Sequence, residues 1–172
     1  MKQPLKTFSA ALPLVCILAL PSCSDHADDA KYRSNPPHIA NLEVVKLHGT
    51  GTNFTVGDTL VATIVQDRYG RLINSATYNW NISVSSTATN PFSHRPNKTG
   101  CLYDEDASNP VDTIIVNTRG VYTINFAGKY RISGSNYEPA NYTENLSGGV
   151  NVTYVSGATS YNINVSRNIT VR

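Results

Sequence analysis

The stretch "ATYNWNISV", residues 76–84, decides the fold class. Apolar and polar residues alternate strictly along it: Tyr78, Trp80, Ile82 and Val84 form one set, and Thr77, Asn79, Asn81 and Ser83 the other. Successive side chains of a β-strand point to opposite faces of a sheet, so this period of two places one set in a core and the other in water. The stretch therefore predicts a half-buried strand with Trp80 in the core.

The same period of two recurs along the chain, beginning with "SYNINVS", residues 160–166. Further strands are predicted at residues 40–47, 58–66, 111–116, 121–132, 150–155 and 168–172. Turn signals such as "DRYGR" and "NTRG" separate neighbouring strands, and segments with a helical period are almost absent. We therefore predict an all-β fold, a single antiparallel two-sheet sandwich of about seven to eight strands.

Two connections are longer than turns. They cover residues 85–110 and 133–149, and both are rich in Asn and Ser. Loops of this length inside a compact domain are usually functional or mobile. We expect these two loops to carry any ligand contact.

Three short motifs carry a family resemblance: Tyr78-Asn79-Trp80, the segment "GVYTINF" at residues 120–126, and Gly57-Asp58-Thr59 ahead of "LVATIV". Together they resemble the PKD-type immunoglobulin-like domains, over roughly residues 39–172. The resemblance implies an immunoglobulin-like sandwich in which a tyrosine closes a corner at the start of strand F. Such domains mostly act as spacers, adhesion modules or accessory parts of surface glycan-handling systems, so the resemblance alone assigns no activity.

The amino-terminal segment has the layout of a secretory signal peptide. Lys2 and Lys6 precede an uncharged apolar run of eleven residues, 10–20. Such a run would rise only about 16 Å as a helix, against roughly 30 Å of bilayer hydrocarbon. The segment Leu20-Pro21-Ser22-Cys23 resembles the bacterial lipoprotein box, which implies removal of residues 1–22 and lipidation of Cys23. The alternative is an ordinary signal peptide with an incidental cysteine.

The acidic segment "SDHADD", residues 24–29, resembles the export segment of Bacteroidetes lipoproteins. It implies an outer-membrane lipoprotein on the cell surface, with the periplasmic face as the alternative. Residues 23–37 are polar and end in Asn35-Pro36-Pro37, which is typical of a flexible tether. The domain organisation expected is a signal peptide at 1–22, a tether at 23–37 and a sandwich at 38–172.

Charge and cysteine content exclude several functional classes. Without Lys2 and Lys6, the 14 basic residues fall to 12 and balance the 12 acidic ones, and no basic stripe is present, so we expect no nucleic-acid partner. With Cys16 in the leader and Cys23 lipidated, Cys101 is left alone and cannot form an internal disulfide.

Three tyrosines in the long connections are the candidate ligand-binding residues: Tyr103, Tyr137 and Tyr142. Flat aromatic faces beside amides and carboxylates suit carbohydrate binding, although surface tyrosines are also common in β-proteins. Asp104 and Asp106 form a weak calcium candidate, but a solvated loop is favoured because no EF-hand spacing is present. The four histidines show no zinc spacing, so no metal and no cofactor are predicted.

No hydrolase, metalloprotease or phosphate-loop motif occurs, and we expect a protein that is not an enzyme. Thr59 and Thr113 lie in Asp-Thr-hydrophobic triplets that resemble the Bacteroidetes O-glycosylation site.

The leading hypothesis is a lipid-anchored cell-envelope protein with a non-catalytic binding, adhesion or glycan-accessory role. Its partners would be the membrane, through the anchor, and a glycan or another envelope protein. The alternatives are a spacer or assembly subunit that pairs through a sheet edge, motivated by the β-rich residues 160–172, and a small hydrolase.

Overall fold

The computed structural model describes residues 33–85, 93–94, 97–100, 109–133 and 136–172. Within these ranges the chain is almost entirely β-strand, with a single 3₁₀ turn, η1 (Ser147–Gly149). The predicted leader, Cys23 and most of the 85–110 connection lie outside the described residues.

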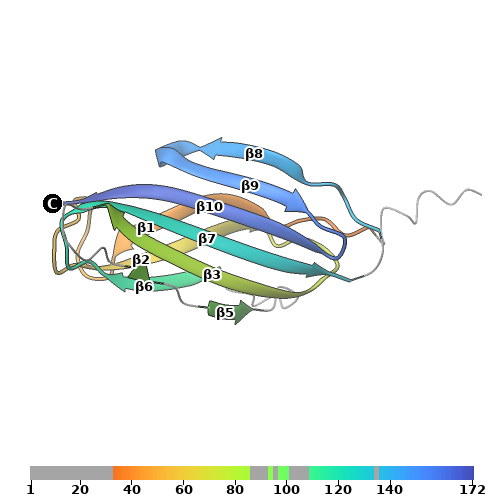
Figure 1. The fold of residues 1–172 in the computed structure, drawn as a ribbon, viewed down its shortest axis with the longest axis horizontal. Helices are drawn as coiled ribbons and strands as arrows, with labels where there is room; N and C mark the ends of the chain where they lie inside the picture. The colour runs from red at the N-terminus through yellow and green to blue at the C-terminus, as the bar shows by residue number, and fades with distance from the viewer. Residues whose placement is uncertain (1–32, 86–92, 95–96, 101–108, 134–135) are drawn as a thin grey trace, which may run out of the picture.

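Two antiparallel sheets face each other (Figure 1). The smaller sheet has the order β1-β2-β6, with strands β1 (His38–Lys46), β2 (Thr59–Arg68) and β6 (Val111–Ile115). The larger sheet is built around β3 (Ile73–Ser85), β7 (Gly120–Ile132), β10 (Ser160–Val171), β9 (Val150–Ser156) and β8 (Asn141–Leu146), in that order. Two short strands, β4 (Ser93–His94) and β5 (Asn97–Gly100), pair with the outer edge of β3. The predicted two-sheet sandwich is confirmed.

The strand order follows the Greek key of immunoglobulin-like sandwiches. There, strands A, B and E form one sheet while C, F and G form the other. Here β1, β2 and β6 take the first three places, and β3, β7 and β10 the second three. The β8–β9 hairpin is inserted between β7 and β10 along the chain, and it widens the large sheet beyond β10.

Aromatic side chains of β3 and β7 fill the core. Trp80 is fully buried, as predicted, and its ring meets Phe126 edge-on with centroids 5.0 Å apart. Tyr78 lies against Phe126 and Tyr130 with centroid distances of 5.6 and 6.0 Å. Each ring removes about 150–250 Å² from water, which at about 25 cal/mol per Å² is an upper bound of roughly 4–6 kcal/mol. The ring-to-ring geometry adds only about 0.5–1.5 kcal/mol, so burial dominates.

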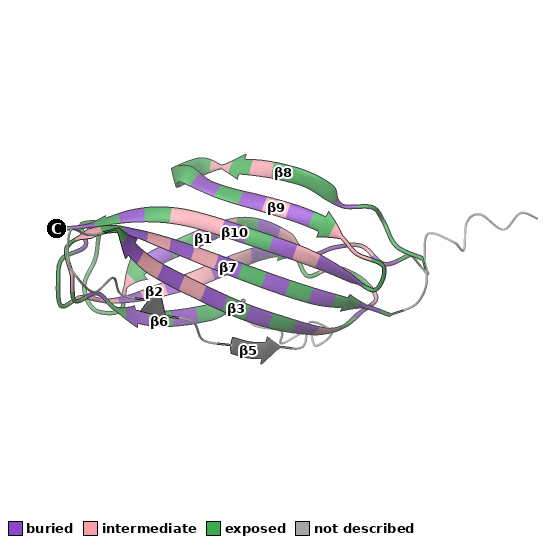
Figure 2. Ribbon diagram, in the orientation of Figure 1, coloured by how far each residue is buried: buried purple, intermediate pink, exposed green. Residues whose placement is uncertain are grey.

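The alternation of buried and exposed residues is visible as stripes along β3, β7 and β10 (Figure 2). Every second residue of these strands enters the core, and the intervening residues form the outer face of the large sheet. The alternation seen at residues 76–84 of β3 therefore continues on β7 and β10.

Tyr122 closes the corner at the start of β7. Its hydroxyl donates to the carbonyl oxygen of Thr118 at 2.9 Å, while the Thr118 amide lies 3.3 Å from the phenol oxygen. Gly120 makes the sharp bend possible, because at φ +149° a Cβ would lie 2.7 Å from the Ser85 carbonyl oxygen. The tyrosine corner implied by the family resemblance is present.

The Gly57-Asp58 segment forms a turn that leads into β2 and is stabilised by contacts of the Asp58 side chain. Gly57 has φ +95°, a conformation that favours glycine. The Asp58 carboxylate accepts the Thr55 amide at 2.7 Å and the Lys46 ammonium at 2.8 Å. The Lys46 hydrogen bond, followed by the Thr55 amide, lowers the pKa of Asp58 because both favour the charged carboxylate.

Residues 33–37 are part of the domain and not of the flexible tether that the sequence predicts. Ser34 is fully buried; its amide donates to the Asn136 carbonyl at 3.0 Å, and its own carbonyl accepts the Tyr161 hydroxyl at 2.8 Å. The guanidinium of Arg71 donates to the Arg33 carbonyl at 2.7 Å. Because these backbone groups are paired, the domain begins near Ser34 and not at His38.

Three strand predictions need correction. Residues 160–166 and 168–172 belong to one strand, β10; the pattern breaks at Arg167, which is on the inward side and donates to the Leu42 carbonyl at 2.7 Å. The 133–149 connection contains β8, whose residues are at most half-buried, so no apolar alternation marks it. The 85–110 connection contains β4 and β5.

Part of β10, the strand that motivates the sheet-edge alternative, is paired on both sides. Over residues 161–166 it is paired with β9 on one side and with β7 on the other. A strand with both edges hydrogen-bonded has no free backbone groups to offer along that length.

Replacing Tyr122 by Phe should lower the free energy of unfolding by about 1 kcal/mol, the net value of a partly buried hydrogen bond. Tyr142→Phe is the matched control, since this hydroxyl makes no hydrogen bond among the described residues. Urea unfolding followed by tryptophan fluorescence measures both. Equal stability of Tyr122→Phe and the native chain would contradict the assigned role of the corner.

Asp58→Asn should remove one source of acid sensitivity. The folded-state pKa of Asp58 lies below its ordinary value of 3.8, so its stabilisation is complete above that value. It is lost as the pH falls through the folded-state pKa, because the unfolded chain then binds the proton more tightly. Urea titrations at about pH 6 and about pH 2 should show a smaller acid-induced loss of stability in the variant than in the native chain. An identical loss in both proteins would refute the assignment.

Candidate functional site

Several candidates named from the sequence lie outside the described residues. These are the lipidation candidate Cys23, the ligand candidate Tyr103 and the weak calcium candidates Asp104 and Asp106. Among the residues that are described, no group of three or more His, Cys, Asp or Glu side chains could hold a metal ion.

Tyr142 is on β8 and covers the edge of the core. It is 40 % exposed, and its ring stacks on Tyr154 with centroids 4.5 Å apart and an interplanar angle of 23°. Partial burial, together with the nearby Glu144 carboxylate, raises the pKa of Tyr142, so the hydroxyl stays neutral. One face of this ring is therefore occupied by Tyr154 and is not open to a sugar.

Tyr137 has a comparable structural role at the amino-terminal segment. It is 36 % exposed, pairs with Ser34 in a parallel bridge and meets Tyr161 edge-on at a centroid distance of 6.5 Å. Tyr137 and Tyr142 thus belong to two separate aromatic contacts, each closing part of the core. Both rings are also partly exposed, and their ligand-binding role stays a prediction.

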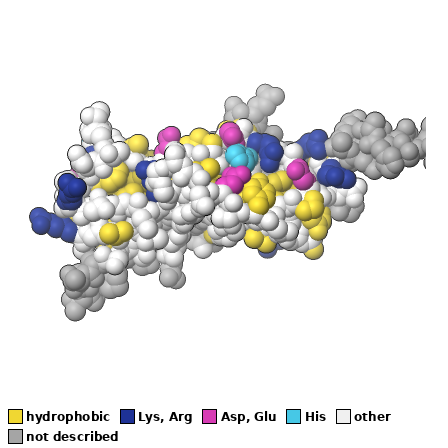
Figure 3. All heavy atoms as spheres, turned by 90° about the horizontal axis from the view of Figure 1, so that it is seen from above, with side chains coloured by type: hydrophobic (Ala, Val, Ile, Leu, Met, Phe, Trp, Pro, Cys, Tyr) yellow, Lys and Arg dark blue, Asp and Glu magenta, His cyan; other side chains and the backbone are white. Residues whose placement is uncertain are grey.

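His38 connects three strands through two carboxylates. Its Nδ1 lies 2.6 Å from Asp67 Oδ1 on β2, and its Nε2 lies 3.3 Å from Glu144 Oε2 on β8. Figure 3 shows a histidine flanked by acidic side chains on the side of the molecule that carries β8. Both ring nitrogens thus face carboxylates, one on a strand of the small sheet and one on a strand of the large sheet. This group therefore connects the two sheets.

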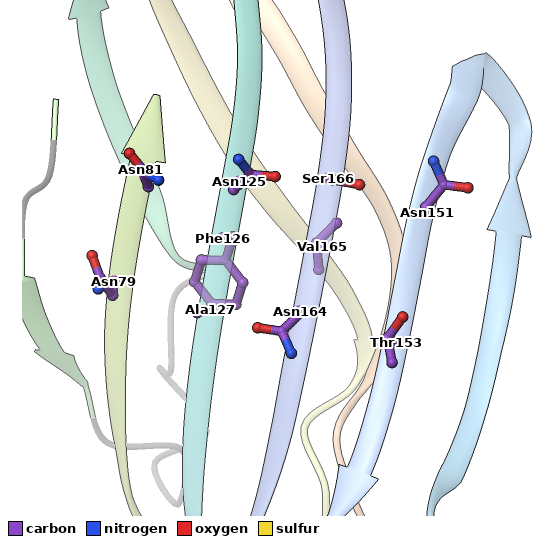
Figure 4. Close-up of a pocket in the computed structure, with 10 residues that line it drawn as sticks. All are labelled: Asn79, Asn81, Asn125, Phe126, Ala127, Asn151, Thr153, Asn164, Val165 and Ser166. Carbon is purple, nitrogen blue, oxygen red and sulfur yellow. The ribbon is translucent and has the colours of Figure 1, made fainter. Parts of the chain in front are cut away.

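The outer face of the large sheet is hollowed by two adjoining depressions of about 430 and 460 Å³. They share Asn79, Ala127 and Asn164, so they form one continuous trough. Six asparagines line it: Asn79, Asn81, Asn125, Asn151, Asn162 and Asn164. Figure 4 shows five of these amides on four neighbouring strands.

The strand register explains the trough. Asn79 on β3 and Asn164 on β10 both stand beside Ala127 of β7. In the next row, Asn81 and Ser166 flank Asn125. Cross-strand neighbours on one face have Cβ atoms about 4.5–5.5 Å apart, so a methyl group between two amides leaves a depression. Ala127 is thus the floor of the trough, and the amides of β3 and β10 form its walls.

The amides of the trough have unused hydrogen-bonding capacity. Within the described residues, the side chains of Asn79, Asn125, Asn151 and Asn164 form no hydrogen bond with the protein. The side-chain oxygen of Asn81 has no donor there either, but it is shielded from solvent and so is not exposed to a ligand. Each amide can donate two hydrogen bonds and accept two. The surface therefore presents an array of neutral donors and acceptors.

Asparagine is a poor strand former, because its side chain competes for backbone hydrogen bonds. Concentrating six of them on the central strands of a sheet works against local propensity. Positions where a sequence departs from a local rule without a packing reason are more often functional than incidental. This departure singles out the trough as the candidate site.

Thr59 and Thr113 are on the opposite surface, the outer face of the small sheet. Thr113 pairs with Val61 and Thr59 with Ile115, so the two threonines are diagonal neighbours on β6 and β2. Thr113 is exposed and Thr59 half-buried. This face also exposes aliphatic side chains, with Val45, Leu47 and Ile115 at 50, 51 and 60 %. The O-glycosylation assignment stays a prediction.

The sequence carries a signal for the trough. The period of two puts Asn79 and Asn81 on the outward side of one strand, and Asn162 and Asn164 on that of another. Only the register, which sets both strands beside Ala127, shows that these amides share one surface.

Comparisons with known proteins add nothing to this site. No family model, no curated protein and no solved structure matches this chain. The described residues contain no helix that is long and apolar enough to cross a membrane.

Proposed function

We propose that this protein is a lipid-anchored, non-catalytic binding module of the bacterial outer membrane. Its ligand is a glycan chain held in the trough of the large sheet. The observation that carries the proposal is the array of asparagine side chains around Ala127, whose hydrogen-bonding groups are unused within the described residues.

Amides suit sugars because each sugar hydroxyl both donates and accepts a hydrogen bond. An asparagine side chain offers both functions from one small group. The trough's two depressions, about 430 and 460 Å³, are in the size range of ligand sites. Because the trough is open and elongated, it fits a chain that lies along the strands better than a compact molecule.

The character of the lining predicts modest affinity. The trough is lined mainly by amide, hydroxyl and small apolar groups, and Phe126 is its one aromatic lining residue, although its side chain is buried in the core. Binding would therefore depend on hydrogen bonds worth about 1 kcal/mol each, since water is displaced from both partners. A few such hydrogen bonds correspond to dissociation constants of roughly micromolar to millimolar. Weak binding by each copy is sufficient where many copies on a surface bind the same chain.

The anchor is proposed from the amino-terminal motif at residues 20–23. The described chain enters the sandwich at one end of its long axis, and the carboxyl terminus lies at the other end (Figure 1). Eleven residue steps separate Cys23 from Ser34, which span at most about 36–40 Å when fully extended. An anchored domain would stand close to the membrane with the trough along its side.

Filling the trough should weaken glycan binding. Ala127→Tyr places a ring on the floor while keeping a residue that favours strands. Val121→Tyr is the matched control, because Val121 is exposed on the same face of the same strand but does not line the trough. On a glycan array followed by calorimetry, we expect at least about tenfold weaker binding for Ala127→Tyr, the loss of one or two hydrogen bonds.

The control should bind as the native chain does, and both variants should keep the native unfolding midpoint. The proposal is overturned if the native protein binds no glycan on the array. It also fails if Ala127→Tyr and Val121→Tyr bind equally well.

The anchor has its own test. Cys23→Ser should prevent incorporation of radiolabelled palmitate and release the protein from the membrane fraction, because one cysteine carries the lipid. Lys6→Ser, upstream of the motif, serves as the control and should keep the label. A native chain that takes up no palmitate would exclude the lipoprotein assignment.

A further inference from the structure

Two cations extend the trough beyond its amides. Lys129 and Arg131 follow Ala127 on β7 and line the second depression. All three belong to the outward set of the strand, in which successive members are about 6.6–6.8 Å apart. The floor strand therefore carries a methyl group followed by two positive charges along one line.

The positions beside these cations carry no charge. Lys129 is flanked by Thr77 on β3 and Asn162 on β10. Arg131 is flanked by Ser75 and Ser160 on the same two strands. No carboxylate lines either depression. The two charges therefore reinforce each other and have no neutralising neighbour among the described lining residues.

Several other cations of the domain have protein partners. Lys46 pairs with Asp58 at 2.8 Å, and the guanidinium groups of Arg71 and Arg167 donate to backbone carbonyls. Within the described residues, Lys129 and Arg131 have no such partner, and both are exposed. Exposed, unpaired cations at the end of a hydrogen-bonding trough are free to meet an anion of a ligand.

We infer that the glycan bound in the trough is acidic, with its hydroxyls on the asparagines and a carboxylate or sulfate group over Lys129 and Arg131. This inference rests on the proposed function and narrows its ligand class. The planar guanidinium of Arg131 can grip two anion oxygens at once, while Lys129 acts as a point charge. The trough thus combines a neutral section that hydrogen-bonds to sugar hydroxyls with a positively charged section that binds acidic groups.

An anionic lipid surface is the competing explanation for the charges. In Figure 1, β7 runs toward the end of the sandwich where the chain enters, so an anchor would bring that end near the membrane. The glycan is favoured because the two cations line the same trough as Asn79 and Asn164. A membrane contact would require no such continuity with the amides.

The test compares matched charged and neutral chains on the purified protein. The probes are oligogalacturonate and its methyl ester, and a sulfated galactan and its desulfated form. The variants are Lys129→Gln/Arg131→Gln and, as a control that removes one cation outside the trough, Arg119→Gln, which alters an exposed residue just before β7. The first pair of probes reports on carboxylate, and the second reports on sulfate.

We expect the native protein to bind one acidic form at least about tenfold more tightly than its neutral partner, the effect of one charge-assisted hydrogen bond. Lys129→Gln/Arg131→Gln should lose this preference and keep the weaker neutral binding, whereas Arg119→Gln should behave like the native chain. The preference should fade between 0.1 and 1 M salt, as the screening length shrinks from about 10 to about 3 Å.

Each contrary result has a distinct meaning. Equal binding of charged and neutral chains would overturn this inference and leave the proposed glycan binding intact. Binding of neither class would overturn both. Sedimentation with phosphatidylglycerol vesicles that the double variant abolishes, without any preference among glycans, would assign the cations to the membrane and also refute the inference.

Discussion

The antiparallel pairing of β7 between β3 and β10 is the constraint on which both the core and the trough depend. Trp80 stands opposite Phe126, and the next residues, Asn81 and Asn125, stand opposite each other on the other face. A shift of β7 by one residue in this pairing would move its aromatic rings to the outer face and its outward residues, among them Asn125 and Ala127, into the core. Burial of the rings therefore holds the amides in register, although no amide contributes to the core.

The inserted hairpin turns a simple sheet face into a wider surface. Thr153 of β9 stands beside Asn164, so the trough continues past β10 onto a strand that the basic Greek key lacks. The contact of His38 with Glu144 joins the hairpin to the small sheet, and the Tyr142–Tyr154 stack packs the two strands of the hairpin together. Tyr142 thus supports the trough indirectly, by packing on the strand that extends it.

The two outer faces of the sandwich have opposite chemistry. The small sheet exposes aliphatic residues such as Leu47 and Ile115, whereas the large sheet exposes amides, hydroxyls and two cations. Both sheets are antiparallel and both have one face in the core, so backbone geometry does not cause the difference. The difference comes from the outward-facing residues alone, because packing of the core does not restrict them.

The sequence by itself determined the fold class and the inward position of Trp80, because both depend on a local period of two, and the family resemblance implied the corner at Tyr122. It did not reveal β8, whose side chains are at most half-buried and follow no apolar period. Nor did it show that residues 33–37 join the domain, since their partners, among them Arg71 and Tyr161, are far along the chain.

The trough depended on tertiary structure for the same reason: Asn79, Ala127 and Asn164 are separated by 48 and 37 residues, and only strand pairing brings them to one place. Local patterns report which side of a strand a residue occupies, but its neighbours across the sheet are chosen by register and topology.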